Sequence, residues 1–244
     1  MPRRYFLENR MEPDCEVAEL TDQEARHLAK VMRAQPGDQV ELFDGSGFQF
    51  VATVSEITRH SVNLRIHSRE QVSREANRRV TIAVSLPKGD RQKWLVEKLC
   101  EVGVTTIIPL KTERSVAQPT DKALTRLRRC VIEASKQCGR NTLMEIESPQ
   151  SLGELIEQTN HEVVRFIAHP YLSADKAASN SDITAINTNG SVIAAIGPEG
   201  GFSEDEVDSA VQSGFKPLSI GSRILRIETA SIAISSLLIY TTDE

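Results

Sequence analysis

The chain has little of what marks membrane or secreted proteins. No apolar stretch approaches the ~20 residues that cross a bilayer, and the opening MPRRYFLENRMEPD contains no apolar signal-peptide core. Over the 244 residues, 39% are hydrophobic and 26% are charged, which is ordinary for a globular protein. We therefore expect a cytoplasmic protein that makes no membrane contact.

Cysteine and histidine are also scarce, and both are scattered. The four cysteines (Cys15, Cys100, Cys130 and Cys138) lack C-x-x-C spacing, and the five histidines do not cluster. This pattern favours reduced thiols over a disulfide framework and gives no sign of a zinc site. No metal is expected.

The net charge of −5 argues against indiscriminate binding to nucleic acid. One stretch, residues 122–140, nevertheless holds six basic residues against a single acidic residue, Glu133. A basic stripe on an acidic protein can contact a polyanion. The alternative, a solvated helix face, is the more common meaning of such a stripe.

The first 72 residues favour a small, mostly β domain. The turn signals DG and GSG separate stretches such as FQFVATV and SVNLRIH, which alternate with the period of a strand. Before them, TDQEARHLAKVMR is typical of a short helix, with Thr21 and Glu24 spaced as a capping box. Residues 73–79 are polar and without periodicity, so we expect a linker there.

Residues 80–244 alternate between apolar strand segments and helical segments. Two further capping boxes are expected, at Ser151 with Glu154 and at Ser203 with Glu206. This alternation predicts a parallel sheet covered by helices on both faces. Because ligands bind beyond the C-terminal ends of such strands, three loops become candidates: residues 169–170, 197–203 and 220–229.

The loop GPEGGFS at 197–203 is rich in glycine but lacks the P-loop and dinucleotide-binding patterns. Carboxylates surround it, at Glu199, Glu204, Asp205 and Glu206. Each would repel a polyphosphate by roughly 1 kcal/mol. The loop therefore suits a neutral or cationic ligand approached closely by main chain, such as S-adenosylmethionine with its sulfonium. Alternatively, it is an ordinary strand-to-helix turn whose acids complement the helix dipole.

The loop at 220–229 carries Arg223 and Arg226 beside Glu228 and Thr229. A guanidinium there could stabilise negative charge developing on a nucleobase. In the alternative interpretation, Glu228 and Thr229 cap the last helix and the arginines are solvated. That helix, SIAISSLLIY, is apolar most of the way round, so the chain or a second subunit must cover it on several sides.

Several stretches occur together in a familiar order: RRYFL, RHLAKVMR, FDGSG, EVGVTTIIPLKTERSV, SKQCGRN, IGPEGGFS and ILRIETA. With them the chain resembles the RsmE family, the small-subunit (16S) ribosomal RNA uridine-N3 methyltransferases of the SPOUT superfamily. The resemblance implies a PUA-like β-barrel over 1–72 that helps to dock RNA. It also implies an α/β SPOUT domain over 80–244 with a parallel sheet and a deep trefoil knot made by the three loops. The family acts as a homodimer, with the last helix near the partner.

The resemblance also implies a site. S-adenosylmethionine would be held by the three loops, at His169, Pro170, Ile196, Gly197, Pro198, Glu199, Gly200, Gly201, Ile220, Gly221, Ile224, Leu225, Arg226 and Thr229. Arg226 would stabilise the charge on the uridine oxygens, and Glu228 would orient Arg226 or accept the N3 proton. The ribosomal RNA, within the small subunit, would be contacted by Arg3, Arg4, Arg33, Lys88, Arg91, Arg140 and Asn141.

Three alternatives remain open at this stage. A SPOUT methyltransferase could act on another RNA or another base atom, which only a substrate assay separates. A non-catalytic RNA-binding factor in ribosome assembly need not bind S-adenosylmethionine. A nucleotide-binding enzyme could use the glycine loop for phosphates, and ATP would then compete for the site.

Overall fold

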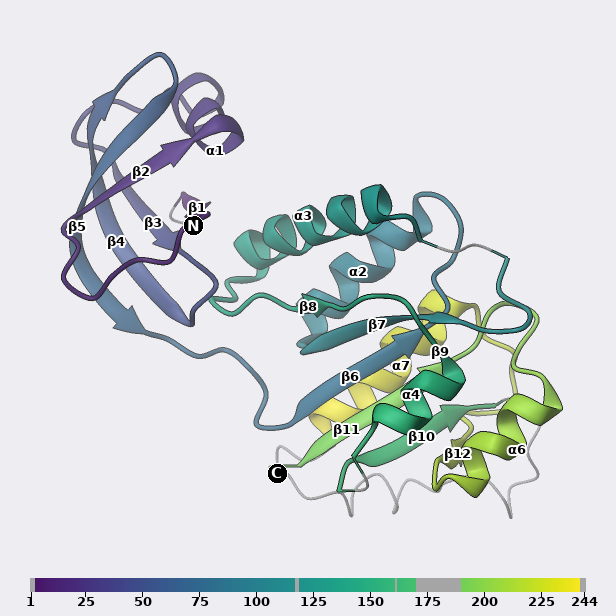
Figure 1. Ribbon diagram of the computed structural model, residues 1–244. Coiled ribbons are helices and arrows are strands. Elements are labelled where there is room, and N and C mark those ends of the chain that lie inside the picture. Colours follow the sequence, from purple (N-terminus) through teal and green to yellow (C-terminus); the bar gives the residue numbers. More distant parts are fainter. Residues whose placement is uncertain (1–2, 117–118, 161, 170–189, 242–244) are drawn as a thin grey trace. The chain divides into compact units, whose positions relative to one another are not determined.

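The computed structural model describes residues 3–116, 119–160, 162–169 and 190–241 (Figure 1). The chain forms two compact units. The first comprises Met1–Glu75 and Ser135–Leu143, and the second comprises Ala76–Ala134 and Met144–Glu244. The short segment Ser135–Leu143 thus belongs with the N-terminal residues, from which it is distant in sequence.

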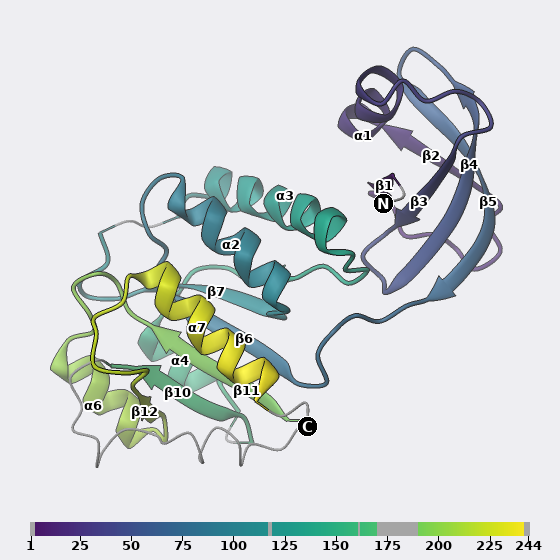
Figure 2. The same cartoon turned by 180° about the vertical axis from the view of Figure 1, so that it is seen from behind.

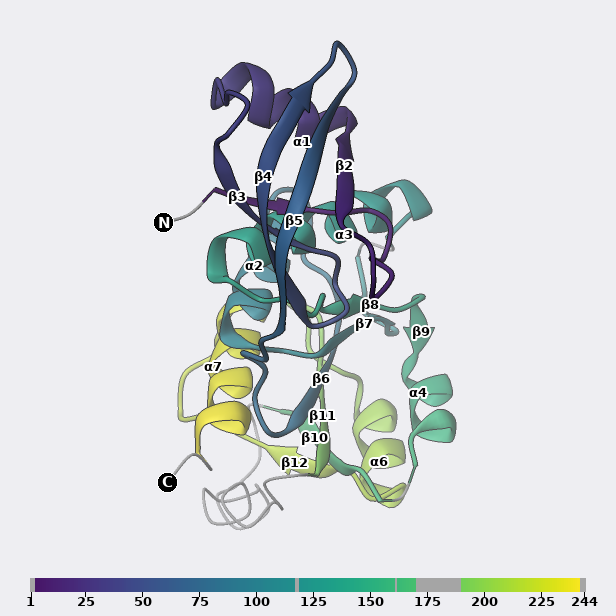
Figure 3. The same cartoon turned by 90° about the vertical axis from the view of Figure 1, so that its left-hand side faces the viewer.

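The first unit is a curled five-stranded sheet in the order β1-β3-β4-β5-β2. Its strands are β1 (Arg4–Phe6), β2 (Val17–Thr21), β3 (Gln39–Phe43), β4 (Phe48–Ile57) and β5 (Ser61–Gln71). The antiparallel strands β4 and β5 run side by side as a long hairpin (Figure 3). Alternate residues such as Leu42, Phe50 and Leu64 point inward and form one apolar core. The expectation of a small, mostly β domain is confirmed.

The capping box expected at Thr21 and Glu24 is wrong. The helix α1 (Asp22–Arg26) begins there and continues as a π-helical turn, η1 (His27–Val31), but the Thr21 side chain makes no capping hydrogen bond. The Glu24 carboxylate instead accepts the Phe6 N–H at 3.2 Å and lies 2.8 Å from Lys136 Nζ. Partners distant in sequence have therefore displaced the local motif.

Arg4 ties the segment Ser135–Leu143 into the first unit. Its guanidinium donates to the Ser135 carbonyl at 2.7 Å and to the Asn141 side-chain oxygen. Its Nε lies 2.6 Å from Glu41 Oε1, and only 7% of its side chain is exposed. A buried arginine needs such partners, because an uncompensated charge in the interior is costly.

The second unit is built on a parallel sheet in the order β12-β10-β11-β6-β7-β8, with β9 paired to β7. Its strands are β6 (Arg79–Val84), β7 (Thr106–Lys111), β8 (Glu145–Ile146), β9 (Gln150–Ser151), β10 (Val164–Ala168), β11 (Ser191–Ile196) and β12 (Lys216–Leu218). Every strand pair is parallel. The strands are apolar throughout because both faces are covered, as predicted.

Helices cover both faces of this sheet (Figures 1 and 2). They are α2 (Arg91–Val102), α3 (Asp121–Cys138), α4 (Leu152–Gln158), α6 (Glu204–Gln212) and α7 (Ile227–Tyr240). The last helix, α7, packs on α2, β6 and β11, whereas α4 and α6 pack together on the opposite face. This confirms the α/β architecture predicted from the alternation.

Both remaining capping boxes are confirmed. Ser151 accepts the Glu154 N–H at 3.2 Å while the Glu154 carboxylate accepts the Ser151 N–H at 2.7 Å. Ser203 and Glu206 repeat the arrangement, at 3.3 and 2.9 Å. The two boxes begin α4 and α6, so they fix where the chain leaves the preceding strand or loop.

The last helix is not fully covered by its own unit. Ile227, Ile234 and Leu238 are buried, but Ile232 and Leu237 are only half-buried and Tyr240 is 58% exposed.

Within the part of the chain that the structure describes, no helix is long and apolar enough to cross a membrane. The same residues contain no cluster of histidine, cysteine and acidic side chains that could hold a metal ion.

Candidate functional site

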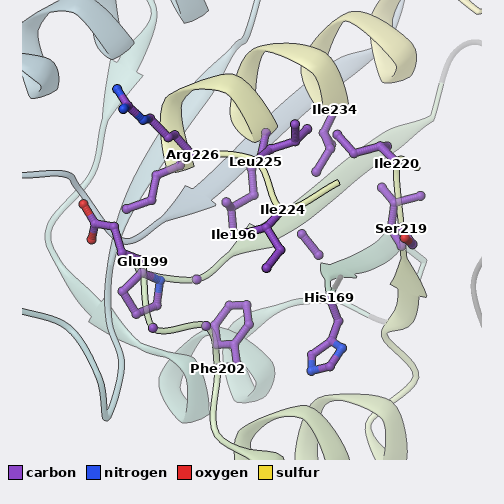
Figure 4. Close-up of a pocket in the computed structure, with 18 of the residues that line it drawn as sticks. His169, Ile196, Glu199, Phe202, Ser219, Ile220, Ile224, Leu225, Arg226 and Ile234 are labelled. Atoms are coloured by element: carbon purple, nitrogen blue, oxygen red, sulfur yellow. The ribbon is translucent and has the colours of Figure 1, made fainter. Parts of the chain in front are cut away.

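A pocket of about 680 Å³ opens at the C-terminal ends of β10, β11 and β12 (Figure 4). Three loops form its walls, and they are the loops that the sequence singled out. It is lined by Arg114, Ala168, His169, Ile196, Gly197, Pro198, Glu199, Gly200, Gly201, Phe202, Glu204, Leu218, Ser219, Ile220, Gly221, Arg223, Ile224, Leu225, Arg226, Ile227, Ala230 and Ile234. The parallel-sheet rule thus located the pocket correctly.

The glycine loop folds back on itself between β11 and α6. The Gly201 N–H donates to the Pro198 carbonyl at 2.8 Å, and Gly201 has a φ of +70°, which a side chain rarely adopts. At Gly197, a Cβ would lie 3.1 Å from Phe202 Cδ2 and 3.2 Å from the Phe202 nitrogen. Both glycines are therefore needed for the shape of the turn, which brings main-chain groups to the pocket surface.

Arg114 braces this loop from outside. Its Nη1 donates to the Gly200 carbonyl at 3.0 Å and to the Phe202 carbonyl at 3.4 Å. The neighbouring Glu113 N–H donates to Glu206 Oε1 at 3.0 Å. The segment that follows β7 therefore holds the glycine loop at its middle and at the start of α6.

A cluster of hydroxyls anchors the brace. Ser115 Oγ lies 2.8 Å from Thr112 Oγ1 and 3.2 Å from Ser85 Oγ, and it accepts the Thr112 N–H at 2.9 Å. Ser85 is buried and its N–H donates to the Ile196 carbonyl at 3.0 Å. The ends of β6, β7 and β11 are thereby joined beneath the pocket.

The carboxylates around the glycine loop are only partly free. Glu199 pairs with Arg91 at 3.1 Å, and Glu206 is used by its capping box and by Glu113. Glu204 lines the pocket and is exposed, as is Asp205. The sequence predicts negative charge at all four carboxylates, whereas the structure compensates two of them, Glu199 and Glu206.

His169 directly follows β10 and lies at the side of the pocket away from Glu199 and Arg226 (Figure 4). Its backbone N–H donates to the Leu218 carbonyl at 3.0 Å, which joins the first loop to the end of β12. Burial lowers the pKa of His169 below its ordinary value of 6.5, so the neutral ring is favoured. The adjoining Pro170, also expected to bind the cofactor, lies outside the described residues.

The third loop delivers Arg226 and Glu228 to different places. Arg226 precedes α7 and is exposed, and its guanidinium points away from the pocket interior (Figure 4). Glu228 is only 7% exposed and does not line the pocket; its Oε1 lies 3.6 Å from Arg91 Nη1. Among the described residues, Glu228 makes no ion pair with Arg226. Thr229 is exposed and likewise outside the pocket lining.

The residues expected to contact RNA divide into two groups. Arg140 and Asn141 are buried in the first unit, where Arg140 Nε donates to Glu75 Oε1 at 3.0 Å and Asn141 Nδ2 donates to the Val72 carbonyl at 2.8 Å. The Arg4 guanidinium is likewise engaged inside the unit, by the Ser135 carbonyl, Asn141 and Glu41. These three side chains serve the interior of the unit, which corrects the expectation that they face RNA. Arg3, Arg33, Lys88 and Arg91 keep exposed surface.

Comparison with known proteins assigns a family. The model of an RNA methyltransferase domain matches residues 74–239, and that of an RNA methyltransferase PUA domain matches residues 20–66. Ribosomal RNA small subunit methyltransferase E from Synechocystis sp. is 30% identical over 89% of this chain and 71% of its own length. The Bacillus subtilis protein of the same name is 27% identical over 99% of this chain and 97% of its own. The chain belongs to the RsmE family.

Solved structures agree with this RsmE-family assignment. A putative methyltransferase from Legionella pneumophila, in complex with SAM, has a TM-score of 0.87 and 32% identity, covering 98% of this chain and 97% of that one. An RsmE from Neisseria gonorrhoeae bound to S-adenosyl methionine has a TM-score of 0.86 and 30% identity, covering 97% and 95%. The predicted fold class, a SPOUT-type parallel-sheet domain with a PUA-like domain, is confirmed. The threading that defines a knot stays a prediction.

Sequence reasoning missed part of the pocket of this RsmE-family chain. No local pattern points to Arg114, because its role depends on the Gly200 carbonyl, which lies 86 positions further along the chain. Phe202 lies within the candidate loop 197–203 but was not among the expected cofactor contacts, whereas Leu218 and Ser219 could have been included by extending the loop at 220–229 by two residues. Ile234 could have been found because it lies two helical turns after Ile227, on the same face of α7.

Proposed function

We propose that this chain transfers a methyl group from S-adenosylmethionine to N3 of a specific uridine in small-subunit (16S) ribosomal RNA. The observation that carries the proposal is the pocket, which is lined by the main chain of the glycine loop, by apolar side chains and by the carboxylates Glu199 and Glu204. Membership of the RsmE family and the two similar structures that carry the methyl donor support it.

The residues present suit this cofactor. Ile196, Leu218, Ile220, Ile224 and Leu225 offer apolar surface for the adenosine, and the glycine loop offers main-chain donors and acceptors. A neutral His169 and an exposed Glu204 suit a sulfonium better than an anion. When bound, S-adenosylmethionine supplies an electrophilic methyl group.

Arg226 is proposed to act on the base. N3 of uridine is a poor nucleophile until it loses its proton, which passes to water in this proposal, and the resulting negative charge spreads over O2 and O4. An exposed guanidinium at the pocket edge can stabilise that charge, because arginine stays protonated and presents a planar fork of donors. The remaining task is to position the base, which is also a large source of rate enhancement.

Glu228 takes a different place from the one expected. The family resemblance implies a carboxylate that orients Arg226, with proton acceptance as the alternative. Its observed partner is Arg91. We therefore propose that Glu228 acts through Arg91.

The first unit, matched by the PUA-domain model, is proposed to dock the RNA, with residues 1–72 as its main part, 73–79 as the linker and 80–244 as the methyltransferase domain. Arg3, Arg33 and Lys88 are proposed phosphate contacts. If they bind phosphates, affinity for RNA falls steeply as salt rises, in proportion to the counterions released. A flat salt response would remove this group from the proposal.

A homodimer in the cytoplasm is proposed as the working form. The half-buried Ile232 and Leu237 and the exposed Tyr240 give α7 an apolar surface that a second copy could cover. Sedimentation of the purified chain over a range of concentrations measures its oligomeric state, and a monomer at every concentration would exclude the dimer.

The deciding experiment is methyl transfer from labelled S-adenosylmethionine to small ribosomal subunits from cells that lack this protein. Mapping the label identifies the nucleotide and the base atom, and methylation at any atom other than uridine N3 would refute the assignment. Arg226→Ala should lose most of its single-turnover rate with saturating cofactor, whereas Lys122→Ala, an exposed charge on α3, should not. A near-normal rate for Arg226→Ala would eliminate its role.

A further inference from the structure

Arg91 connects two walls of the pocket from outside. It opens α2, where its Nη2 lies 3.1 Å from Glu199 Oε1 on the glycine loop. Its Nη1 lies 3.6 Å from Glu228 Oε1 in the first turn of α7. One planar guanidinium therefore bridges two carboxylates whose segments are otherwise separate in sequence.

The two arms of this bridge are unequal. Glu199 is 48% exposed at its side chain, and a pair of that kind contributes little by itself because water screens it. Glu228 has a side chain only 10% exposed, and its Oε2 has no hydrogen-bond partner among the described residues. Arg91 is the cation that compensates this carboxylate, so the buried arm depends on it.

The bridge also lies next to the residue proposed to act on the base. Arg226 is the residue immediately before α7, two positions before Glu228. A displacement of Glu228 therefore moves the backbone that carries Arg226. On the other arm, Glu199 belongs to the glycine loop, which lines the pocket together with the loop that carries Arg226.

We propose that Arg91 is a positioning residue that fixes the distance between the glycine loop and Arg226, and so aligns the methyl donor with the base. This rests on the proposed methyl transfer. It assigns Arg91 a role inside the protein, in place of the RNA contact that the family resemblance implied.

The two roles respond differently to a lysine. A phosphate contact needs one positive charge, which lysine supplies, whereas two carboxylates on different segments need the two-sided fork of arginine. Arg91→Lys should therefore behave like Arg91→Ala if the bridge matters, and like the unchanged protein if charge alone matters.

Kinetics on the full-length chain with small ribosomal subunits test this. For Arg91→Ala and Arg91→Lys we expect the single-turnover rate at saturating RNA and cofactor to fall roughly ten- to hundredfold, because a small misplacement of reacting groups lowers the rate by up to that factor. The KM for RNA and its salt dependence should stay unchanged. The matched control is Lys93→Ala, an exposed charge on the same helix, which should stay within about twofold.

Three outcomes overturn the proposal: a raised KM for RNA with a normal rate, full rescue by lysine, or no effect of Arg91→Ala. Unchanged protein that neither binds S-adenosylmethionine nor methylates RNA would refute the proposed function instead, so the two failures are distinguishable.

A stability cycle tests the buried arm separately. Arg91→Ala leaves the Glu228 charge buried without its cation, so its melting temperature should fall. Adding Glu228→Gln to Arg91→Ala removes that charge and should recover part of the loss, while the methylation rate stays low. Glu199→Gln should shift the melting temperature little. If the double variant is no more stable than Arg91→Ala alone, Arg91 does not compensate Glu228 and the proposal fails.

Discussion

Replacing Ser203 with alanine should loosen the glycine loop, whereas the same change at Ser151 should not. Both serines complete capping boxes of nearly the same geometry, but only Ser203 follows directly on the loop that lines the pocket. Loss of an N-cap serine costs about 1 kcal/mol. For a cooperative unit of this size the melting temperature should drop by roughly 2–4 °C in either variant.

The two variants should differ in cofactor binding. If the whole ~1 kcal/mol is lost from the loop conformation that binds the cofactor, Ser203→Ala raises the Kd for S-adenosylmethionine about fivefold. Ser151→Ala leaves it unchanged, because α4 contributes no residue to the pocket lining. Isothermal titration and thermal unfolding of both variants check this. Equal affinities would show that the start of α6 does not control the loop.

Acid should remove part of the capping contribution at Ser151. Hydrogen bonds from the Ser151 backbone and side chain lower the pKa of Glu154 from its ordinary value of 4.5. The carboxylate therefore stabilises the fold fully above that ordinary value, and this contribution disappears as the pH falls through the lowered pKa of the folded state. The stability difference between Glu154→Ala, which lacks that carboxylate, and the unchanged protein should accordingly shrink in acid. A difference that persists unchanged would contradict this account.

Three further changes have defined outcomes. Gly197→Ala should cost about 1–3 kcal/mol in urea unfolding and weaken cofactor binding, because its Cβ meets the Phe202 nitrogen and ring at 3.1–3.2 Å; unaltered binding would show that the ring moves freely. Cofactor affinity measured between about pH 5 and 8 should fall as the pH drops through the lowered pKa of His169, because the charged ring repels a sulfonium. The variant His169→Gln should abolish that fall. A thiol reagent should label the exposed Cys15 first and the buried Cys130 slowly, since burial raises the pKa of that thiol; equal rates would refute the burial.

Local patterns predicted the parts of the fold that local interactions decide. Ser151 and Ser203 cap their helices because the serine and the glutamate of each box lie within one turn and need no distant partner. The position of the pocket also followed from the sequence, since parallel strands bring their C-terminal loops to one edge whatever the residues between them.

Patterns failed where distant partners decide. Glu24 has the spacing of a capping residue, yet Lys136 and the Phe6 N–H take its carboxylate. Arg4 and Arg140 were expected to be exposed, as arginines usually are, but each meets a glutamate within the first unit. Nothing in the spacing of these residues along the chain reveals that they meet.

The split membership of Ser135–Leu143 has a practical consequence for anyone dividing this protein. The chain passes from one unit to the other three times, at Glu75–Ala76, Ala134–Ser135 and Leu143–Met144. A fragment ending at Glu75 would lack the main-chain carbonyl and the amide that satisfy Arg4, and would expose that guanidinium to solvent beside an unfilled gap. An autonomous first unit therefore requires the later peptide to be supplied, either in trans or through a designed connection.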